Sequence, residues 1–295
     1  MAGLGYTIMM GIIRLMGLKK IFKRVPMNYQ KLRRSDVLVP KPWMIRNLPY
    51  RQFALENAVI TEITSPEPQP GLVILLHGGA FVSGPAAHHW STLAQMVKEL
   101  GVTVWMCTYP KAPEYTVEQV TASVDAMYAE ALEHHQAQAI ALIGDSAGGN
   151  LATTLCQRLR ARGQELPGKL VLVSPVMDAT LENPDAAAME RKDVMLSKPG
   201  LVHANQMYAG DLPLSDPSIS PIQGSFVGFP DTLFYMGEYD ILYPDQQRAV
   251  AKMREAGVSV HAEVGEKLPH VWPFLPMLKE GNAARRQIID FIRLR

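Results

Sequence analysis

The stretch "AIALIGDSAGGNLATTLCQRLRA", residues 139–161, joins an apolar run to a helix-period segment through a turn of small residues. The run "AIALI" (139–143) is typical of a buried strand, and Leu151, Leu155 and Leu159 recur at the four-residue spacing of a helix. A strand followed by a helix is the repeating unit of α/β proteins with parallel sheets. We therefore expect an α/β fold built around this stretch.

The same alternation extends in both directions along the chain. Further apolar runs, each predicted to be a strand, are "LVILL" (72–76), "VTVWMCTY" (102–109), "KLVLV" (169–173), "TLFYM" (232–236) and "VSVHAEV" (258–264). Helix-period segments separate the runs, and strands that are apolar throughout are buried on both faces. The pattern predicts a mostly parallel central sheet flanked by helices. The alternating segment "AVITEIT" (58–64) is expected to form an outer antiparallel strand.

Composition and net charge indicate which kinds of molecule the protein binds. The chain has 295 residues, 47% of them hydrophobic, and a formal net charge of +1. This is enough apolar material for one large core or two small ones. Proteins that bind nucleic acid gather basic residues on one face, so we expect a small-molecule partner and no nucleic acid. Cys107 and Cys156 lie in apolar segments and are expected to be buried free thiols, which favours a cytoplasmic location.

The N-terminal stretch "LGYTIMMGIIRLMGLKKIFKRV" (4–25) is apolar as far as Leu18 and basic after it. The apolar run is shorter than the ~20 residues of a membrane span and is interrupted by Arg14. Its positive charges follow the apolar run, whereas those of a secretory signal precede it. Two interpretations stay open: a helix packed on the protein, and a helix in peripheral contact with a membrane surface.

Two segments depart from the strand and helix alternation. They are residues 1 to about 50 and the long connection from about Asp178 to Gly224. Long insertions in compact domains usually form lids, and the alternative is a plain loop.

Ser146 lies in the turn "GDSAGG" between the expected strand and helix. Such a turn is sharp, and a side chain at Gly144 or Gly148 would clash with the neighbouring backbone, so the hydroxyl stands exposed. A serine hydroxyl becomes a good nucleophile when a base removes its proton and a carboxylate orients that base. We therefore interpret Ser146 as a nucleophile.

The acid and the base are expected beyond the carboxyl ends of later strands, where sites collect in parallel sheets. Asp240 in "TLFYMGEYD" and His270 in "VSVHAEVGEKLPHVW" meet this expectation. The chain order Ser, Asp, His is that of a nucleophile on a strand-to-helix turn. Glu238 and Asp245 remain alternatives to Asp240 as the acid.

Other polar residues are expected to have structural roles. Asp145 is interpreted as stabilising its own turn. Two histidine pairs are expected to be solvated, because a metal site would need a third ligand; they are His88, His89, His134 and His135. Three further histidines match the position of a base less well than His270 does; they are His77, His203 and His261.

Stabilisation of an oxyanion requires backbone N–H groups aimed at one point. The segment "HGGAF" (77–81) follows an early strand, and its small residues allow close approach to a substrate oxygen. The N–H of Ala147, directly after the nucleophile, is expected to complete the oxyanion hole.

From about residue 55 to its end, the chain resembles the hormone-sensitive-lipase-like branch of the α/β-hydrolases, which are bacterial carboxylesterases. The segments that carry the resemblance are "HGGAF" for H-G-G-G, "YPKAPE" (109–114) for Y-R-L-A-P-E, "GDSAGGNLA", "DPSISPI" (216–222), "GEYDIL" (237–242) and His270. The resemblance implies oxyanion donors at Gly79, Ala80 and Ala147, with His77 and Gly78 as supporting motif residues. It also implies a helical cap formed by residues 1–50 and about 178–213, on a catalytic domain of residues 51–295.

The chain departs from the family pattern in two places. Ala80 replaces the third glycine of H-G-G-G, and its methyl group is expected to narrow the substrate pocket without removing the N–H donor. Tyr243 and Pro244 precede Asp245, which makes the acid loop one residue longer than usual.

Together these residues predict a serine carboxylesterase that acts on short to medium acyl esters with neither metal nor organic cofactor. The family often forms dimers, so a homodimer is expected. An amidase or peptidase with the same triad is the alternative. A ligand-binding receptor is disfavoured, because a pocket that only binds does not need His270.

Overall fold

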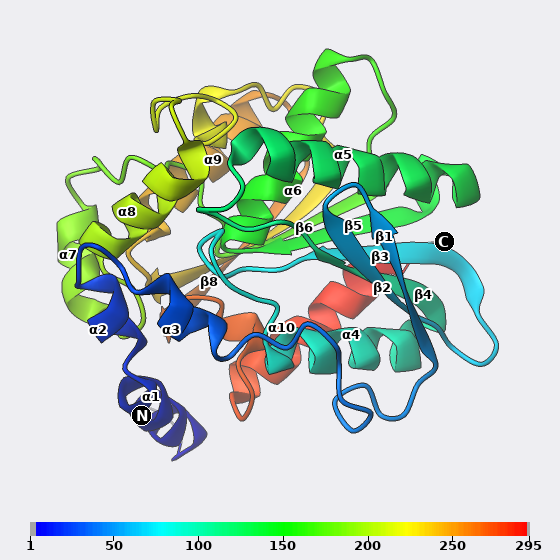
Figure 1. Ribbon diagram of the computed structural model, residues 1–295, viewed down its shortest axis with the longest axis horizontal. Helices are drawn as coiled ribbons and strands as arrows, with labels where there is room; N and C mark the ends of the chain where they lie inside the picture. Colours follow the sequence, from blue (N-terminus) through cyan, green and yellow to red (C-terminus); the bar gives the residue numbers. More distant parts are fainter. Residues whose placement is uncertain (1–3, 294–295) are drawn as a thin grey trace.

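The computed structural model describes residues 4–293, and its centre is one sheet (Figure 1). The strands are β1 (Tyr50–Leu55), β2 (Ala58–Ile63), β3 (Gln69–Leu76), β4 (Val102–Thr108), β5 (Ile140–Asp145), β6 (Lys169–Val173), β7 (Asp231–Tyr239) and β8 (Val260–Pro269). Their order is β1-β2-β4-β3-β5-β6-β7-β8. β2 is antiparallel to β1 and β4, and the other neighbouring pairs are parallel. The prediction of a mostly parallel α/β sheet is confirmed.

The edge of the sheet differs from the prediction. The segment expected to be the outer strand, β2, is second from the edge, because β1 pairs with it from Tyr50 opposite Ile63 to Leu55 opposite Ala58. The residues of β1 are mostly exposed or half-buried, so its sequence "YRQFAL" contains no apolar run to mark it as a strand.

Helices cover both faces of the sheet (Figure 1). One face carries α4 (Ala87–Leu100) and α10 (Lys279–Ile292), and the other carries α5 (Val117–His134), α6 (Ala147–Ala161) and α9 (Tyr243–Glu255). In β3, Leu72 and Ile74 belong to the core under α5 and α6, whereas Val73 and Leu75 belong to the core under α4 and α10. Successive side chains of a strand point to opposite faces, so burial on both faces requires an uninterrupted apolar run.

The N-terminal helices lie against the connection between β6 and β7. The remaining elements are α1 (Leu4–Met16), α2 (Leu18–Phe22), α3 (Tyr29–Arg33), α7 (Ala186–Lys192) and α8 (Lys198–Ala209), with 3₁₀ turns at Ala137–Ala139, Pro221–Gln223 and Trp272–Phe274. A Cβ atom at Gly200 of α8 would lie 2.4 Å from the carbonyl oxygen of Phe22, so α2 and α8 pack backbone to backbone. Lys19 Nζ also donates to the carbonyl oxygen of Glu190 at 2.5 Å.

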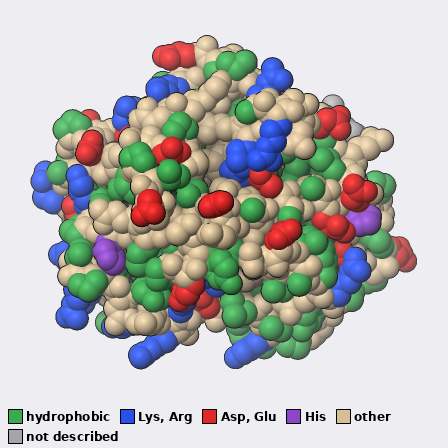
Figure 2. Space-filling model, turned by 45° about the horizontal axis from the view of Figure 1, so that its top comes forward, with side chains coloured by type: hydrophobic (Ala, Val, Ile, Leu, Met, Phe, Trp, Pro, Cys, Tyr) green, Lys and Arg blue, Asp and Glu red, His purple; other side chains and the backbone are tan. Residues whose placement is uncertain are grey.

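Three further observations bear on the sequence expectations. Among residues 4–293, no helix has both the length and the apolar character that a membrane crossing requires. Cys107 and Cys156 are buried free thiols, as predicted. On the face that Figure 2 shows, acidic and basic side chains are interspersed.

Candidate active site

Ser146 occupies a strained turn between β5 and α6. Its φ of 51° and ψ of −117° lie in a region that non-glycine residues rarely adopt. The turn needs its glycines, because a Cβ at Gly144 would lie 2.3 Å from the Gly148 carbonyl oxygen and one at Gly148 would lie 1.9 Å from that of Leu76. Ser146 N–H donates to the Val173 carbonyl at 2.9 Å, which ties the turn to the end of β6.

Ser146, Asp240 and His270 come together beyond the ends of β5, β7 and β8. His270 Nε2 lies 2.9 Å from Ser146 Oγ, and His270 Nδ1 lies 2.7 Å from Asp240 Oδ2. The other oxygen of Asp240 accepts the N–H of Leu242 at 2.9 Å. All three side chains are buried. Since Asp240 accepts a hydrogen bond from Nδ1–H, the neutral ring presents Nε2 as an acceptor to the serine hydroxyl.

The alternative acids lie elsewhere. Glu238 accepts the backbone N–H of Lys267, and Asp245 accepts from Asn183 and Arg248. No hydrogen bond joins either carboxylate to His270 among the residues that the structure describes.

The segment 77–84, which we call the H-G-G loop, follows β3 and folds back on itself. The carbonyl oxygen of Gly79 accepts the N–H groups of Val82 and Ser83 at 3.1 and 3.0 Å. Gly79 and Ala80 both have positive φ, 134° and 54°. In residues 4–293 we find no acceptor for the backbone N–H of Gly79, Ala80 or Ala147. Such free donors are available to a ligand oxygen.

Asp145 joins two segments instead of stabilising its own turn, which corrects the expectation. Its Oδ1 accepts the N–H of Gly78 at 2.9 Å and lies 3.1 Å from His89 Nε2. Burial by itself raises the pKa of Asp145, but the interactions with His89 outweigh this effect, and the pKa is lowered. The buried carboxylate thereby anchors the first residues of the H-G-G loop.

His88 and His89 are not the solvated pair that the sequence suggested. His89 is buried and His88 is half-buried, and desolvation lowers the pKa of His88 to about 3. His134, by contrast, is exposed, as expected, and its Nε2 lies 3.1 Å from Glu130, whereas His135 is half-buried.

The donor atoms of His88, His89 and Asp145 lie within 4.8 Å of one another, which makes them a candidate metal cluster. However, His89 Nδ1 accepts the N–H of Ala86 at 2.9 Å, so the proton of the neutral ring sits on Nε2 and points at Asp145. A metal ligand must present a bare nitrogen. This geometry favours a hydrogen-bond network over a metal site.

His77 serves the structure of the H-G-G loop. Its ring stacks on Tyr109 with centroids 4.3 Å apart, and Tyr109 Oη donates to the His77 carbonyl at 2.6 Å. Burial lowers the pKa of His77 well below its ordinary value. Its Nδ1 lies 2.8 Å from the carbonyl oxygen of Gly78.

Two acidic residues near the site carry no sequence pattern that identifies them. Asp193, between α7 and α8, is buried and accepts the N–H of Ile241, next to Asp240, at 2.9 Å. Burial and the neighbouring Asp240 raise the pKa of Asp193 to about 6. Asp36, between α3 and β1, accepts the N–H of Gly84 in the H-G-G loop at 2.6 Å.

A cavity of about 140 Å³ opens onto Ser146 and His270. Residues of the H-G-G loop form one wall. Most of the large apolar side chains that line it come from the N-terminal segment and from the connection between β6 and β7; they are Leu18, Phe22, Leu32, Met195, Leu196 and Leu201.

Comparison with known proteins assigns the family. A family model described as the α/β hydrolase fold matches residues 73–274. The chain is 31% identical over 228 residues to a triacylglycerol lipase of Mycobacterium tuberculosis, covering 73% of this chain and 47% of that protein. It is 32% identical over 192 residues to an esterase of Acinetobacter venetianus, covering 64% and 63%. The matches therefore span less than two thirds of either relative.

A solved structure extends the likeness to nearly the whole chain. The crystal structure of an esterase from the bacterial hormone-sensitive lipase family superposes with a TM-score of 0.86 at 26% identity. The superposition covers 99% of this chain and 98% of that one. The chain therefore belongs to the α/β-hydrolase fold family, on its hormone-sensitive-lipase-like branch.

Proposed function

We propose that this protein is a serine carboxylesterase. The observation that carries the proposal is the hydrogen-bonded chain from Ser146 Oγ through His270 to Asp240, at 2.9 and 2.7 Å. The free N–H groups of Gly79 and Ala80 supply the second requirement of acyl transfer. The names of the two relatives, lipase and esterase, agree with it.

Acylation follows from these contacts. Ser146 Oγ attacks the ester carbonyl carbon while His270 Nε2 takes the hydroxyl proton, and the carbonyl electron pair moves onto oxygen. The N–H groups of the H-G-G loop and of Ala147 stabilise that oxyanion. The tetrahedral intermediate then collapses, and the departing alkoxide takes the proton from His270.

Deacylation uses the same groups in reverse. Water attacks the acyl group on Ser146 as His270 removes one of its protons, and the acid is released when Ser146 recovers a proton from His270. Asp240 stays ionised and stabilises the imidazolium in both halves of the reaction.

The small volume of the cavity is evidence for a substrate with a short acyl chain. Its volume of about 140 Å³ is below the ~300–1,000 Å³ of pockets that hold larger ligands. Ala80, which replaces the third glycine of H-G-G-G, is one of its lining residues. We therefore propose short to medium acyl esters as substrates, and not the long-chain glycerides that the name of the triacylglycerol lipase relative suggests.

Residues 1–50 and about 178–213 are proposed to act as a cap over a catalytic domain of residues 51–295. In support, α2 packs on α8, and Phe22 and Leu201 both line the cavity. These two segments would set the size of the substrate.

The N-terminal segment is proposed to touch an anionic membrane surface. The protein is proposed to be cytoplasmic, because its two free thiols suit a reducing compartment. Ile8, Ile12 and Leu15 of α1 are 41%, 40% and 88% exposed. A neighbouring groove is lined by basic residues, namely Arg14, Lys19, Lys20, Lys23, Arg191 and Lys192. An apolar stripe beside basic residues suits anionic lipid.

Vesicle sedimentation tests this contact. Ile12→Gln with Leu15→Gln should reduce binding to phosphatidylglycerol vesicles, and Val227→Gln, at an exposed apolar residue outside α1, should not. Equal binding of the wild type, the double variant and Val227→Gln to the vesicles would refute the membrane contact.

A homodimer is also proposed, in which the exposed edge strand β8 would pair with β8 of a second copy. Light scattering tests it by measuring the mass in solution.

The first enzymatic test compares the wild type with Ser146→Ala on p-nitrophenyl esters from acetate to laurate. We expect the highest rate at a short acyl chain and a loss of at least ~10³-fold in the variant. Ser91→Ala is the matched control, because Ser91 is exposed on α4 and, within residues 4–293, its hydroxyl makes one hydrogen bond, to the His88 carbonyl. Activity of Ser146→Ala equal to that of this control would refute the mechanism.

Matched ester and amide substrates separate the two reaction types. A higher kcat/KM for the ester supports the carboxylesterase, and a higher value for the amide supports the amidase or peptidase. Binding without turnover of either substrate would indicate a receptor.

A further inference from the structure

Residues 33–37, which we call the strap, tie the N-terminal segment to the H-G-G loop. Arg33 Nε donates to the Val82 carbonyl at 2.7 Å, and Val37 N–H donates to the Pro85 carbonyl at 2.7 Å. The strap therefore runs alongside the second half of the loop and its continuation.

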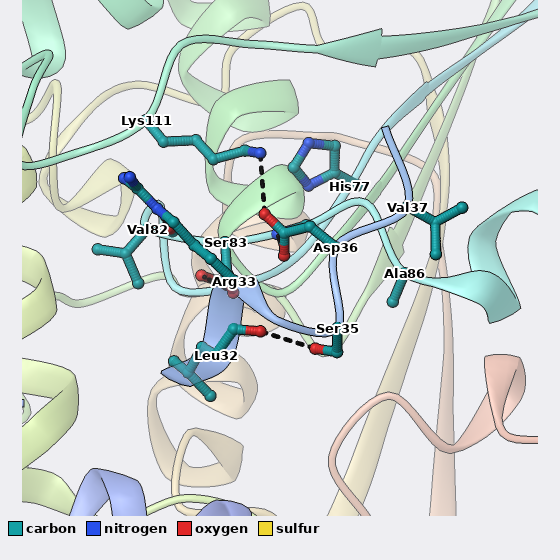
Figure 3. Close-up of polar contacts among 12 residues, drawn as sticks. Leu32, Arg33, Ser35, Asp36, Val37, His77, Val82, Ser83, Ala86 and Lys111 are labelled. Atoms are coloured by element: carbon teal, nitrogen blue, oxygen red, sulfur yellow. Dashed lines mark hydrogen bonds and ion pairs between the residues drawn. The ribbon is translucent and has the colours of Figure 1, made fainter. Parts of the chain in front are cut away.

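Asp36 is the charged residue at the middle of the strap. Its Oδ1 accepts the Gly84 N–H at 2.6 Å, and its Oδ2 lies 3.2 Å from Lys111 Nζ. Figure 3 shows the Lys111 ammonium directed at the Asp36 carboxylate. The side chain of Asp36 is only 10% exposed and that of Lys111 only 12%. A hydrogen bond from a backbone N–H to a shielded carboxylate is stronger than one between neutral groups.

Gly84 connects Asp36 to the start of the loop, because its backbone packs closely against the first two residues of the loop. Its φ is 99°, and a Cβ atom there would lie 2.5 Å from both the Gly78 carbonyl oxygen and His77 Nδ1. The backbone of Gly84 is therefore in direct contact with His77 and Gly78. On the opposite side, Asp145 accepts the Gly78 N–H at 2.9 Å. Two carboxylates thus hold the loop, one at each end.

We propose that Asp36 is a positioning residue for the oxyanion hole: by holding Gly84 N–H, it fixes the direction of the Gly79 and Ala80 N–H groups. The inference rests on the proposed esterase function. The two donors must be aimed before the reaction, because a donor that reorients during the reaction loses much of its value. Asp36 also lines the cavity, but no hydrogen bond joins it to Ser146 or His270 among the residues that the structure describes, and its proposed effect is transmitted through the loop.

The effect should appear in kcat more than in KM, because the oxyanion forms in the tetrahedral intermediate and the transition states that flank it and is absent from the bound ester. Asp36→Ala removes the acceptor of Gly84 N–H, and we expect kcat to fall ~10- to 100-fold with KM within about threefold of the wild type. Asp36→Asn keeps an acceptor oxygen and is expected to retain kcat within about threefold. This pair separates the hydrogen bond from the ion pair with Lys111.

Gln52→Ala is the matched control. It weakens the attachment of the chain after the strap to β1, but it leaves the contacts of the H-G-G loop in place. Gln52 Nε2 donates to the Leu38 carbonyl at 3.2 Å, which attaches the chain just after the strap to β1 without touching the H-G-G loop. Its kcat should equal that of the wild type. An unchanged kcat in Asp36→Ala, an equal loss in Asp36→Asn, or an equal loss in Gln52→Ala would each overturn the proposal.

Amide hydrogen exchange of residues 78–86 gives a readout that needs no substrate. We expect faster exchange in this segment for Asp36→Ala than for the wild type, Asp36→Asn or Gln52→Ala. Unchanged exchange in Asp36→Ala would overturn the positioning role even with esterase activity present. If the wild type hydrolyses no ester while exchange responds as expected, the esterase proposal fails and the control of the loop by Asp36 stands.

Discussion

At the scale of single residues, His270 is subject to two opposed effects. Its burial by itself lowers the pKa, whereas the charge and hydrogen bond of Asp240, helped by Asp193 and Asp145, raise it, and the net pKa lies above the ordinary 6.5. The ring must be neutral to take the proton of Ser146. We therefore expect kcat/KM to fall as the pH drops through a pKa above 6.5, measured with a neutral ester over about pH 5 to 9.

The same shift affects stability. A folded-state pKa above the unfolded one means that protonated His270 stabilises the fold. This contribution is complete below the unfolded pKa of about 6.5 and is lost as the pH rises through the folded pKa. Removal of the imidazole in His270→Gln should abolish this component, measured as the pH dependence of the free energy of unfolding. An acid limb of kcat/KM below 6.5 would contradict the raised pKa of His270.

Asp193 offers a second prediction at this scale. Its negative charge raises the pKa of His270, so Asp193→Asn should move the acid limb of kcat/KM to lower pH. The asparagine retains an oxygen for the N–H of Met195 and Leu196. Asp185→Asn, at an exposed position in the same connection, is the control and should leave the limb in place. A limb that does not move would show that Asp193 serves the fold alone.

At the scale of elements, β5, the Ser146 turn and α6 form a unit that depends on close backbone approach. A Cβ at Gly148 would lie 1.9 Å from the Leu76 carbonyl oxygen, so Gly148→Ala should cost about 3 kcal/mol of unfolding free energy and most of the activity. Gly11 of α1 has no atom within 4 Å of such a Cβ, and Gly11→Ala should gain ~0.5–1 kcal/mol. Urea unfolding of both variants measures the contrast, and similar stabilities would contradict the packing argument.

At the scale of the whole molecule, the N-terminal segment and the connection between β6 and β7 meet over the cavity. Phe22 is buried, contacts α8 through its backbone and lines the cavity. Phe22→Ala should lower the unfolding free energy by about 3–5 kcal/mol and shift the preferred ester toward longer acyl chains. Leu212→Ala, at a half-exposed loop position, should change neither quantity. If Phe22→Ala shows the same dependence of rate on acyl-chain length as the wild type, the N-terminal segment does not determine which ester is preferred.

The sequence determined the parts of this protein that depend on neighbours along the chain. Runs such as "LVILL" identify strands buried on both faces, and Gly144 and Gly148 identify the sharp turn around Ser146, because period and size are local properties. The positions of Ser146, Asp240 and His270 after β5, β7 and β8 also made them the candidates, since parallel strands end at one edge of the sheet, although the sequence left Glu238 and Asp245 as alternative acids.

Only the tertiary structure decided the contacts that support this site. Asp36 meets Gly84 across 48 positions, His89 meets Asp145 across 56, and Asp193 meets Ile241 across 48. Buried polar groups need partners, but those partners can come from any segment that the fold brings near. No periodicity records such a pairing, so these residues read as ordinary surface or turn positions until the chain is folded.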